Sequence, residues 1–205
     1  ARAFYEAGYR SAAQVARAAA AELYENWTDV SGFLMADPAI VPDPQPIRSI
    51  TYKELRELSY MGAQVLHEEA VFPVREAGIP IHIKNTQRPE DPGTLIVPQQ
   101  TEKKATIVTG IAGRKDFRVI SVEKARLREE SDFLRKLISV FESNEVPIEN
   151  MPSSIDSISV IVSQAAIQNK EKKILEEIRI YCQPDALTSM PSMALVAVVG
   201  HGMNH

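Results

Sequence analysis

Polar side chains that could bind a ligand follow an apolar segment near the start of the chain. Thr28 and Asp29 come directly after a predicted strand, and Asp37-Pro38 follows a second apolar stretch. Open α/β sheets bind their ligands where buried strands give way to loops, so this pattern predicts a ligand site. The same residue types are common in strand-end turns that bind nothing, and the spacing alone favours that simpler interpretation.

The composition is that of a globular protein with no surface for nucleic acid or membrane. The chain has 205 residues, 44% hydrophobic and 24% charged, which is enough to bury a substantial core. A net charge of -4 with interspersed acids and bases gives no basic stripe for nucleic acid and no polybasic face for a membrane. Small molecules and other protein chains are therefore the expected partners.

Cysteine and histidine offer little chemistry by their spacing. Cys182 is the single cysteine and lies on the apolar face of a predicted helix, which favours a buried, inert thiol. His201 and His205 have the spacing of metal ligands, but no third ligand is evident, so no metal site is predicted. With no secretory signal and no apolar run long enough for a bilayer, the expected location is the cytoplasm.

Hydrophobic periodicity predicts alternating helices and strands in the first half of the chain. Ser11 can cap an alanine-rich helix, and Thr51 with Glu54 fits the capping box of another. Isoleucines at every second position of 79–83 indicate a strand with one buried face. The predicted elements are helix 11–22, strand 23–27, a proline-rich loop at 38–46, helices 51–62 and 65–76, and strands 78–84 and 95–97.

The second half has a different order of elements, separated from the first by a polar stretch at 99–104. A strand near Ala186 would complete a split βαβ, ferredoxin-like unit with two helices on one face of an antiparallel sheet. A further apolar strand at 194–199 would need a partner sheet. The other predicted elements are strand 117–122, helix 131–144, strands 146–150 and 155–163, and helix 168–182.

Several motifs, in order, resemble those of the aspartate kinases, which belong to the amino-acid kinase superfamily and carry regulatory ACT domains. Residues 28–32 and 36–38 are similar to the family's Thr-Asp-Val-Asp-Gly and Ala-Asp-Pro-Arg, and 62–67 to its Gly-Ala-Lys-Val-Leu-His. Lys84-Asn85-Thr86 and Pro92-Gly93-Thr94 resemble the close of the catalytic domain. Residues 109–112, 151–156 and 200–203 resemble regulatory segments. Any one of these would be weak, whereas together at family spacing they are strong.

The resemblance implies an α/β fold: the C-terminal part of an amino-acid kinase αβα sandwich, followed by a ferredoxin-like (βαββαβ) ACT domain. The expected domains are a partial kinase domain at 1–98, a linker at 99–105, and an ACT region at 106–205 with one unit and the start of a second. It also implies phosphorylation of the L-aspartate side-chain carboxylate with ATP and Mg²⁺. This reaction is the first step of lysine, threonine and methionine biosynthesis.

The resemblance also implies two sets of binding residues. An amino-acid effector, lysine by expectation, would bind the ACT region at a pairing interface, and the protein would form homo-oligomers, expected to be dimers, through ACT domains. The effector candidates are Phe133, Leu134, Pro147, Ile148, Glu149, Ser154, Ile155 and Asp156, of which Phe133, Leu134 and Ile148 could equally be core. The nucleotide candidates are Thr28, Asp29, Asp37, Pro38, Gln64, Val65 and Lys84.

The chain also departs from the family pattern. Ala39 stands where the family usually has arginine and Gln64 where it often has lysine, so two cationic contacts to phosphate are in question. The family's Lys-Phe-Gly-Gly phosphate loop and its aspartate-binding motif have no counterpart, and no catalytic residue is identified. We therefore expect these 205 residues alone to be inactive. The alternative is a regulatory fragment or subunit that binds an amino acid and dimerises without turnover.

Overall fold

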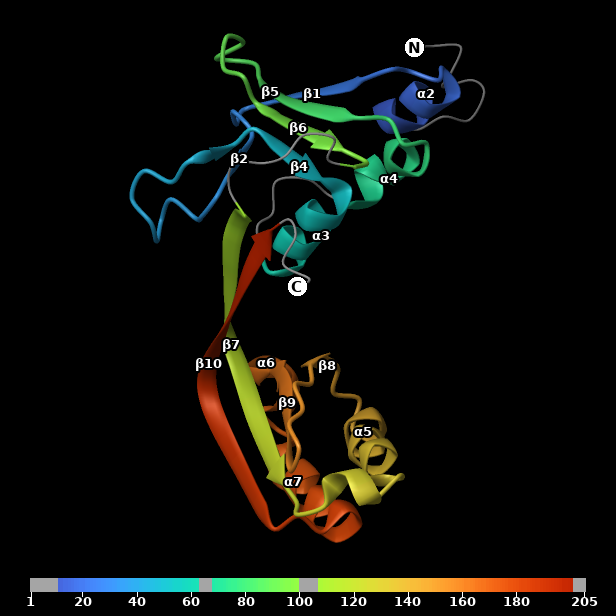
Figure 1. The fold of residues 1–205 in the computed structure, drawn as a ribbon, viewed down its shortest axis with the longest axis vertical. Helices are drawn as coiled ribbons and strands as arrows, with labels where there is room; N and C mark the ends of the chain where they lie inside the picture. Colours follow the sequence, from blue (N-terminus) through green and yellow to red (C-terminus); the bar gives the residue numbers. More distant parts are fainter. Residues whose placement is uncertain (1–10, 63–67, 100–106, 201–205) are drawn as a thin grey trace. The chain divides into compact units, whose positions relative to one another are not determined.

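A computed structural model describes residues 11–62, 68–99 and 107–200, in two compact units (Figure 1). The first unit comprises the chain up to Gly113 and again from Val196, and the second comprises Arg114–Leu195. Most of the predicted linker at 99–105 lies outside the described residues, and the predicted domain limits stay a prediction. Two long strands have residues in both units: β7 (Val108–Glu123) and β10 (Ala186–Gly200).

A mixed four-stranded sheet organises the first unit, in the order β1-β5-β6-β4. The β1–β5 and β4–β6 pairs are parallel, whereas β5 and β6 are antiparallel. A separate hairpin of β2 and β3 forms a two-stranded sheet. The strands are β1 (Tyr24–Thr28), β2 (Phe33–Leu34), β3 (Pro46–Ile47), β4 (Ser49–Thr51), β5 (Ile81–Asn85) and β6 (Thr94–Val97).

One face of this sheet is buried against helices. Ile81 and Ile83 are fully buried while His82 and Lys84 between them are partly exposed, which confirms the predicted alternation of β5. Leu55 and Leu58 of α3 and Val71 and Val74 of α4 belong to the same core cluster. Figure 1 shows α3 and α4 on the same side of the sheet. The helices are α2 (Ala12–Ala18), α3 (Tyr52–Tyr60) and α4 (Glu68–Glu76).

Both predicted helix caps, at Ser11 and Thr51, are confirmed. The Ser11 hydroxyl accepts a hydrogen bond from the Gln14 amide, and Thr51 forms its capping box with Glu54. The first helix was predicted to reach residue 22, which was wrong, since α2 ends at Ala18 and Ala20 has a left-handed φ of 49°. The alanines at this end are exposed, so no burial supports the propensity of alanine for further helix.

The capping carboxylate of α3 has a second role in the first unit. Glu54 is 6% exposed and its Oε2 accepts hydrogen bonds from the Thr51 amide at 2.8 Å and the Thr51 hydroxyl at 2.7 Å. Its Oε1 accepts one from the hydroxyl of Thr109, in β7, at 2.5 Å. Since an unsatisfied buried carboxylate would be costly, these contacts fix the start of α3 against β7.

The second unit has the βαββαβ order that the sequence predicts, with β7 and β10 as its outer elements in the chain. Its sheet has the order β10-β7-β9-β8, and β9 is antiparallel to both β7 and β8. Phe133, Leu137 and Phe141 of α5 and Ile174 and Ile178 of α7 fill the core against this sheet. The other elements are a 3-10 turn (Leu127–Glu129), α5 (Phe133–Ser143), β8 (Ile148–Asn150), β9 (Ser157–Ser163), α6 (Gln164–Ile167) and α7 (Glu171–Cys182).

Two strands are longer than predicted. The separate strands expected near Ala186 and at 194–199 are one continuous strand, β10, which contains Pro191. Because β10 is at the edge of its sheet, a proline can be accommodated without removing a ladder hydrogen bond. β7 begins at Val108 rather than at Phe117, since its first half mixes glycine and charged residues that hide the strand period. No helix of the described residues is long and apolar enough to span a membrane.

Alkaline pH should reveal the buried phenol at the start of α3. Tyr52 donates a hydrogen bond from its hydroxyl to the Ile79 carbonyl at 2.5 Å, and burial raises its pKa to about 12. The folded pKa lies above the unfolded value of 10.0, so the stability that this proton provides is complete below pH 10 and is lost towards pH 12.

We expect the stability of the wild type to fall, relative to Tyr52→Phe, by about 2 kcal/mol across that range. Chemical denaturation of both proteins at a series of pH values measures the difference. Parallel pH profiles for the two proteins would contradict a raised pKa for Tyr52.

Candidate functional site

The loops after β1 and β5 start at the same edge of the sheet. The two strands are parallel and in register from Tyr24–Ile81 to Thr28–Asn85, so both chains leave the sheet side by side. Hydrogen bonds then join the two loops: the side-chain amide of Asn85 donates to the Ser31 hydroxyl at 2.8 Å. Ser31 in turn donates to Asp91 at 2.5 Å. This edge is where the sequence predicts a ligand site.

A pocket of about 800 Å³ opens at this edge within the first unit. The loop after β1, the β2–β3 hairpin, the loop after β5 and the start of β7 form its walls. Predicted residues Asp29, Asp37 and Pro38 all line it, so the structure brings these three together. The other lining residues are Val30, Ser31, Gly32, Phe33, Leu34, Ala36, Ile40, Val41, Pro46, Leu58, Gly62, Asn85, Gln87, Arg88, Ile111, Ala112, Gly113 and Val196.

The two pocket carboxylates are held by local turns. Asp29 accepts a hydrogen bond at Oδ1 from the Thr28 hydroxyl at 3.1 Å. Asp37 accepts one at Oδ1 from the Ala39 amide at 2.8 Å, and its carbonyl accepts from the amides of Ile40 and Val41. The Asp37 Oδ2 atom has no hydrogen-bond partner among the described residues. The turn therefore presents a fixed acceptor to the pocket.

Large apolar side chains with high exposure form another wall of the same pocket. Val30, Leu34, Ile40 and Val41 are 39–69% exposed although they are large and hydrophobic. Their apolar surface is not used in the core, and covering it with a flat, weakly polar ring would be favourable. A ligand with an aromatic part and hydroxyl groups fits this combination of apolar wall and carboxylate acceptors.

Two predicted nucleotide residues lie outside the pocket lining. Thr28 uses its carbonyl to accept from the Thr86 amide at 2.8 Å, which joins the two strand ends. Lys84 donates from Nζ to the Asp91 carbonyl at 2.7 Å, and Nζ lies 5.8 Å from the centre of the Trp27 ring. Gln64 and Val65 lie outside the described residues.

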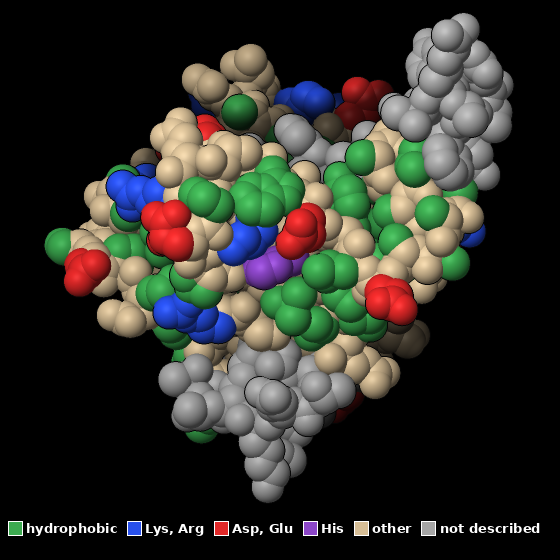
Figure 2. Space-filling model, turned by 90° about the horizontal axis from the view of Figure 1, so that it is seen from above, with side chains coloured by type: hydrophobic (Ala, Val, Ile, Leu, Met, Phe, Trp, Pro, Cys, Tyr) green, Lys and Arg blue, Asp and Glu red, His purple; other side chains and the backbone are tan. Residues whose placement is uncertain are grey.

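Charged and apolar side chains of the described residues alternate on the face that Figure 2 shows. Figure 2 shows apolar, acidic and basic side chains interspersed over the described part of this face. This mixed surface agrees with the interspersed charges of the sequence.

Sequence reasoning missed Arg88, the basic side chain among the described lining residues. Arg88 follows a predicted strand in a stretch with turn residues, and its position in the sequence does not indicate a contact with the loop after β1. The signal is the parallel pairing of β1 and β5, which places the residues after Asn85 beside those after Thr28. A prediction of parallel pairing would therefore have brought Arg88 to the same edge as Asp29.

The predicted effector residues lie around the start of α5 and strand β8 in the second unit. Phe133 is 1% exposed and belongs to the core, whereas Leu134 is 45% exposed and Ile148 is partly buried. Glu149 lies 3.6 Å from Arg114 in an ion pair. Pro147, Ser154, Ile155 and Asp156 are exposed.

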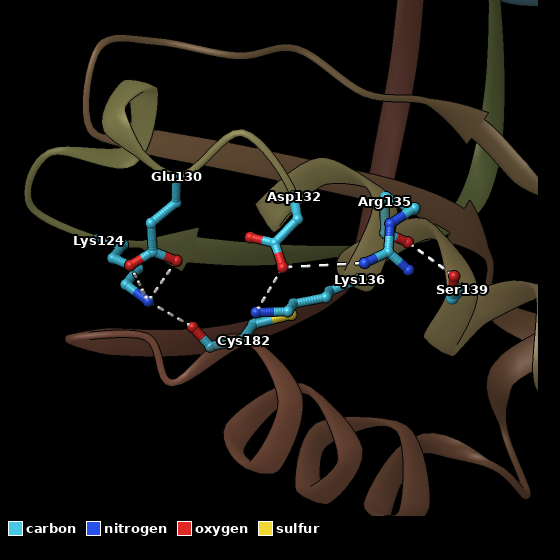
Figure 3. Close-up of polar contacts among 7 residues, drawn as sticks. All are labelled: Lys124, Glu130, Asp132, Arg135, Lys136, Ser139 and Cys182. Carbon is cyan, nitrogen blue, oxygen red and sulfur yellow. Dashed lines mark hydrogen bonds and ion pairs between the residues drawn. The ribbon is translucent and has the colours of Figure 1, made fainter.

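A set of charged residues surrounds the start of α5 (Figure 3). Lys124 pairs with Glu130 at 2.7 Å and donates to the Cys182 carbonyl at 2.8 Å. Its Nζ also lies 5.4 Å from the centre of the Phe133 ring. Asp132 pairs with Lys136 at 2.9 Å, and this hydrogen bond lowers the pKa of Asp132 and raises that of Lys136. Burial raises the pKa of the Cys182 thiol, as expected for an inert cysteine.

Glycine is required where the loop after β1 meets β6. A Cβ atom on Gly32, whose φ is +102°, would lie 2.3 Å from the Thr94 hydroxyl and 2.8 Å from the Thr94 amide nitrogen. We expect Gly32→Ala to lower the free energy of unfolding by about 2–4 kcal/mol.

Gly78→Ala is the control, because Gly78 has a φ of +68° but nothing within 4 Å of its added Cβ. It should cost only about 1 kcal/mol for the left-handed backbone. Urea denaturation measures both losses, and equal losses would contradict the close contact at Gly32.

Comparison with known proteins gives a consistent result. Residues 9–85 match the amino acid kinase family. Aspartokinase 3 of Bacillus subtilis (strain 168) is 36% identical over 186 residues, which cover 90% of this chain and 41% of that protein. The crystal structure of Clostridium acetobutylicum aspartate kinase is 54% identical with a TM-score of 0.83, covering 92% of this chain and 44% of that one.

A more distant structure shares the fold. Aspartokinase III of E. coli, solved in complex with lysine and aspartate, has a TM-score of 0.71 at 22% identity, over 92% of this chain and 42% of that one. The chain thus spans about two fifths of the length of these three relatives. In its motifs, its sequence and the fold of its described residues, the chain belongs to the aspartate kinases of the amino acid kinase superfamily.

Proposed function

We propose that this chain supplies the nucleotide-binding half and the regulatory unit of an aspartate kinase. The enzyme would transfer the γ-phosphoryl group of ATP to the side-chain carboxylate of L-aspartate and form 4-phospho-L-aspartate. The observation that carries the proposal is the pocket at the ends of β1 and β5. There, Asp29 and Asp37 of the two family motifs face one cavity with an apolar wall.

The residues of the pocket suit a nucleoside. The exposed apolar side chains of Val30, Leu34 and Ile40 can cover an adenine ring, since aromatic rings gain most from such contact. The Asp37 carboxylate, fixed by the Ala39 amide, can accept hydrogen bonds from ribose hydroxyls. Arg88 would then lie on the side of the anionic phosphates, where its guanidinium can pair with phosphate oxygens.

Phosphoryl transfer asks for positioning and for neutralisation of charge. The acceptor is itself a carboxylate, so no base is needed to remove a proton from it. The described residues would therefore act by orienting the nucleotide, with the base against the hairpin and the phosphates towards Arg88. Mg²⁺ would arrive with the nucleotide, because in kinases it binds phosphate oxygens and only one or two carboxylates.

An assay of ADP release tests the activity. The protein, including any residues that its gene encodes outside these 205, is mixed with Mg·ATP and L-aspartate in a coupled assay. We expect ADP release with L-aspartate and none with L-asparagine, whose amide cannot accept the phosphoryl group in this reaction. Release that does not depend on L-aspartate would overturn the proposed substrate.

Asp37→Asn tests the nucleotide site. The asparagine keeps an oxygen for the Ala39 amide but replaces the second acceptor with a donor, so we expect Mg·ADP binding to weaken about tenfold or more. The matched control is Asp43→Asn, an exposed carboxylate of the same hairpin that does not line the pocket. Titration calorimetry measures both, and equal affinities for the two variants would contradict the role of Asp37.

The proposed regulation uses the second unit as an ACT domain. An amino-acid effector would bind between the start of α5 and β8, with its carboxylate near the helix N-terminus and its ammonium groups near Glu149 and Asp156. Lysine is the proposed effector, because a second ammonium group can use a second carboxylate. The protein would pair through these domains, so that the effector bridges two chains.

Glu149→Gln tests the effector site, since it removes one carboxylate but keeps the shape of the side chain. We expect the affinity for L-lysine to fall about tenfold or more. Asp116→Asn is the control: it changes the same charge in the second unit, and asparagine tolerates the φ of 68° found there.

A folded, dimeric sample of the unmutated protein that gives no calorimetric heat with lysine, threonine or methionine would count against amino-acid sensing.

A further inference from the structure

The β2–β3 hairpin supplies one wall of the proposed nucleotide pocket, and one buried hydroxyl forms hydrogen bonds with both of its strands. We propose that Thr94 is a positioning residue for the nucleotide, acting through this hairpin and not by contact with the ligand. The inference rests on the proposed nucleotide site, because the hairpin matters for binding only if the base packs there. Thr94 is absent from the residues that line the pocket.

The geometry of Thr94 joins three strands at one atom. Its side chain is 0% exposed at the first position of β6, and its Oγ1 accepts a hydrogen bond from the Phe33 amide at 2.8 Å. The same hydroxyl donates its proton to the Ile47 carbonyl at 2.6 Å. Phe33 and Ile47 pair with each other across the hairpin. One hydroxyl therefore satisfies a donor on β2 and an acceptor on β3.

The residue before the hairpin is shaped for this contact. Gly32 has no Cβ, and one placed there would lie 2.3 Å from the Thr94 hydroxyl. The glycine lets the backbone of the loop after β1 approach the hydroxyl closely. Two residues far apart in the chain thus make one tight junction between the loop and β6.

Other contacts also hold the base of the hairpin: Phe33 and Ile47 are buried in the core, and the Leu95 amide donates to the Arg48 carbonyl at 2.9 Å, one residue after β3. Each strand has two residues, and a hairpin of this length is marginal without anchoring to other structure. Two backbone hydrogen bonds hold the middle of the hairpin, away from the end that Thr94 contacts. The Met35 amide donates to the Gln45 carbonyl at 2.8 Å, and the Ile111 amide donates to the Met35 carbonyl at 2.7 Å. The hairpin carries the lining residues Phe33, Leu34, Ala36, Asp37, Pro38, Ile40, Val41 and Pro46.

A purely structural threonine would lower stability when replaced but leave the pocket intact in the folded protein. Thr94→Val is nearly isosteric and leaves the Phe33 amide and the Ile47 carbonyl buried without their partner. Thr94→Ser keeps the hydroxyl and loses only a methyl group. The control for lost stability is Tyr52→Phe, which breaks a buried hydrogen bond to the Ile79 carbonyl; neither residue lines the pocket.

Calorimetric titration with Mg·ADP, well below the unfolding temperature, compares the four proteins. We expect Thr94→Val to weaken ADP binding at least about tenfold, and Thr94→Ser to stay within about threefold of the wild type. Tyr52→Phe should lower the unfolding midpoint but bind ADP as the wild type does. Hydrogen exchange should be faster at residues 33–47 in Thr94→Val alone.

Two results would overturn the positioning role. One is a Thr94→Val protein that binds ADP as tightly as Tyr52→Phe at a similar loss of stability. The other is unchanged hydrogen exchange at residues 33–47 in Thr94→Val, which would show that the hydroxyl does not hold the hairpin. If the wild type itself binds no ADP, the proposed nucleotide site fails, and the exchange measurement still decides whether Thr94 holds the hairpin.

Discussion

Parallel pairing between β1 and β5 determines where the residues of the candidate site meet. The two strands are separated by more than fifty positions in the chain, yet their register aligns Thr28 with Asn85. Parallel strands end at the same edge, so the loops that follow them share one region of space. The Asn85–Ser31–Asp91 hydrogen bonds then close that region into a pocket wall. Without this register, the motif residues would be surface turns in separate places.

The pocket combines rigid backbone with apolar side chains that the core does not use. Its backbone is fixed at close approaches that only glycine permits, at Gly32 against Thr94 and at Gly93, whose Cβ would lie 2.0 Å from the Ile83 carbonyl. Exposed valine, leucine and isoleucine side chains are costly in water unless something covers them. The protein thus maintains a shaped apolar surface next to fixed acceptors, which is the physical requirement for recognising a ring that carries hydroxyl groups.

Local patterns predicted the elements, and long-range contacts decided the rest. A few neighbouring residues determine the capping boxes at Ser11 and Thr51 and the alternation of isoleucines in β5. Sequence reasoning could therefore predict these features. Arg88 could not be found, since its place depends on the pairing of distant strands. Phe133 illustrates the opposite limit: its position at a helix start fitted both a binding site and the core, and the structure buries it beneath Lys124.

The strand lengths show a further limit. β10 continues through Pro191 because it lies at the edge of its sheet, and edge position is a property of the assembled sheet that no local window contains. β7 has a different reason, since it lies between β10 and β9 in its sheet, and pairing with neighbouring strands supports a strand whose own residues hide the period. Propensity arguments end such strands early, and tertiary pairing extends them.

The carboxylate of Glu54 serves two elements at once, and this sharing constrains how the sequence can change. It accepts hydrogen bonds from Thr51, the N-cap residue of α3, and from Thr109, the second residue of β7. Removing the Glu54 carboxylate takes a hydrogen-bond partner from both threonines, whereas changing either threonine removes only its own hydrogen bond with Glu54. Because Glu54 contacts both threonines, we do not expect the stability effects of changes at Glu54 and at either threonine to add.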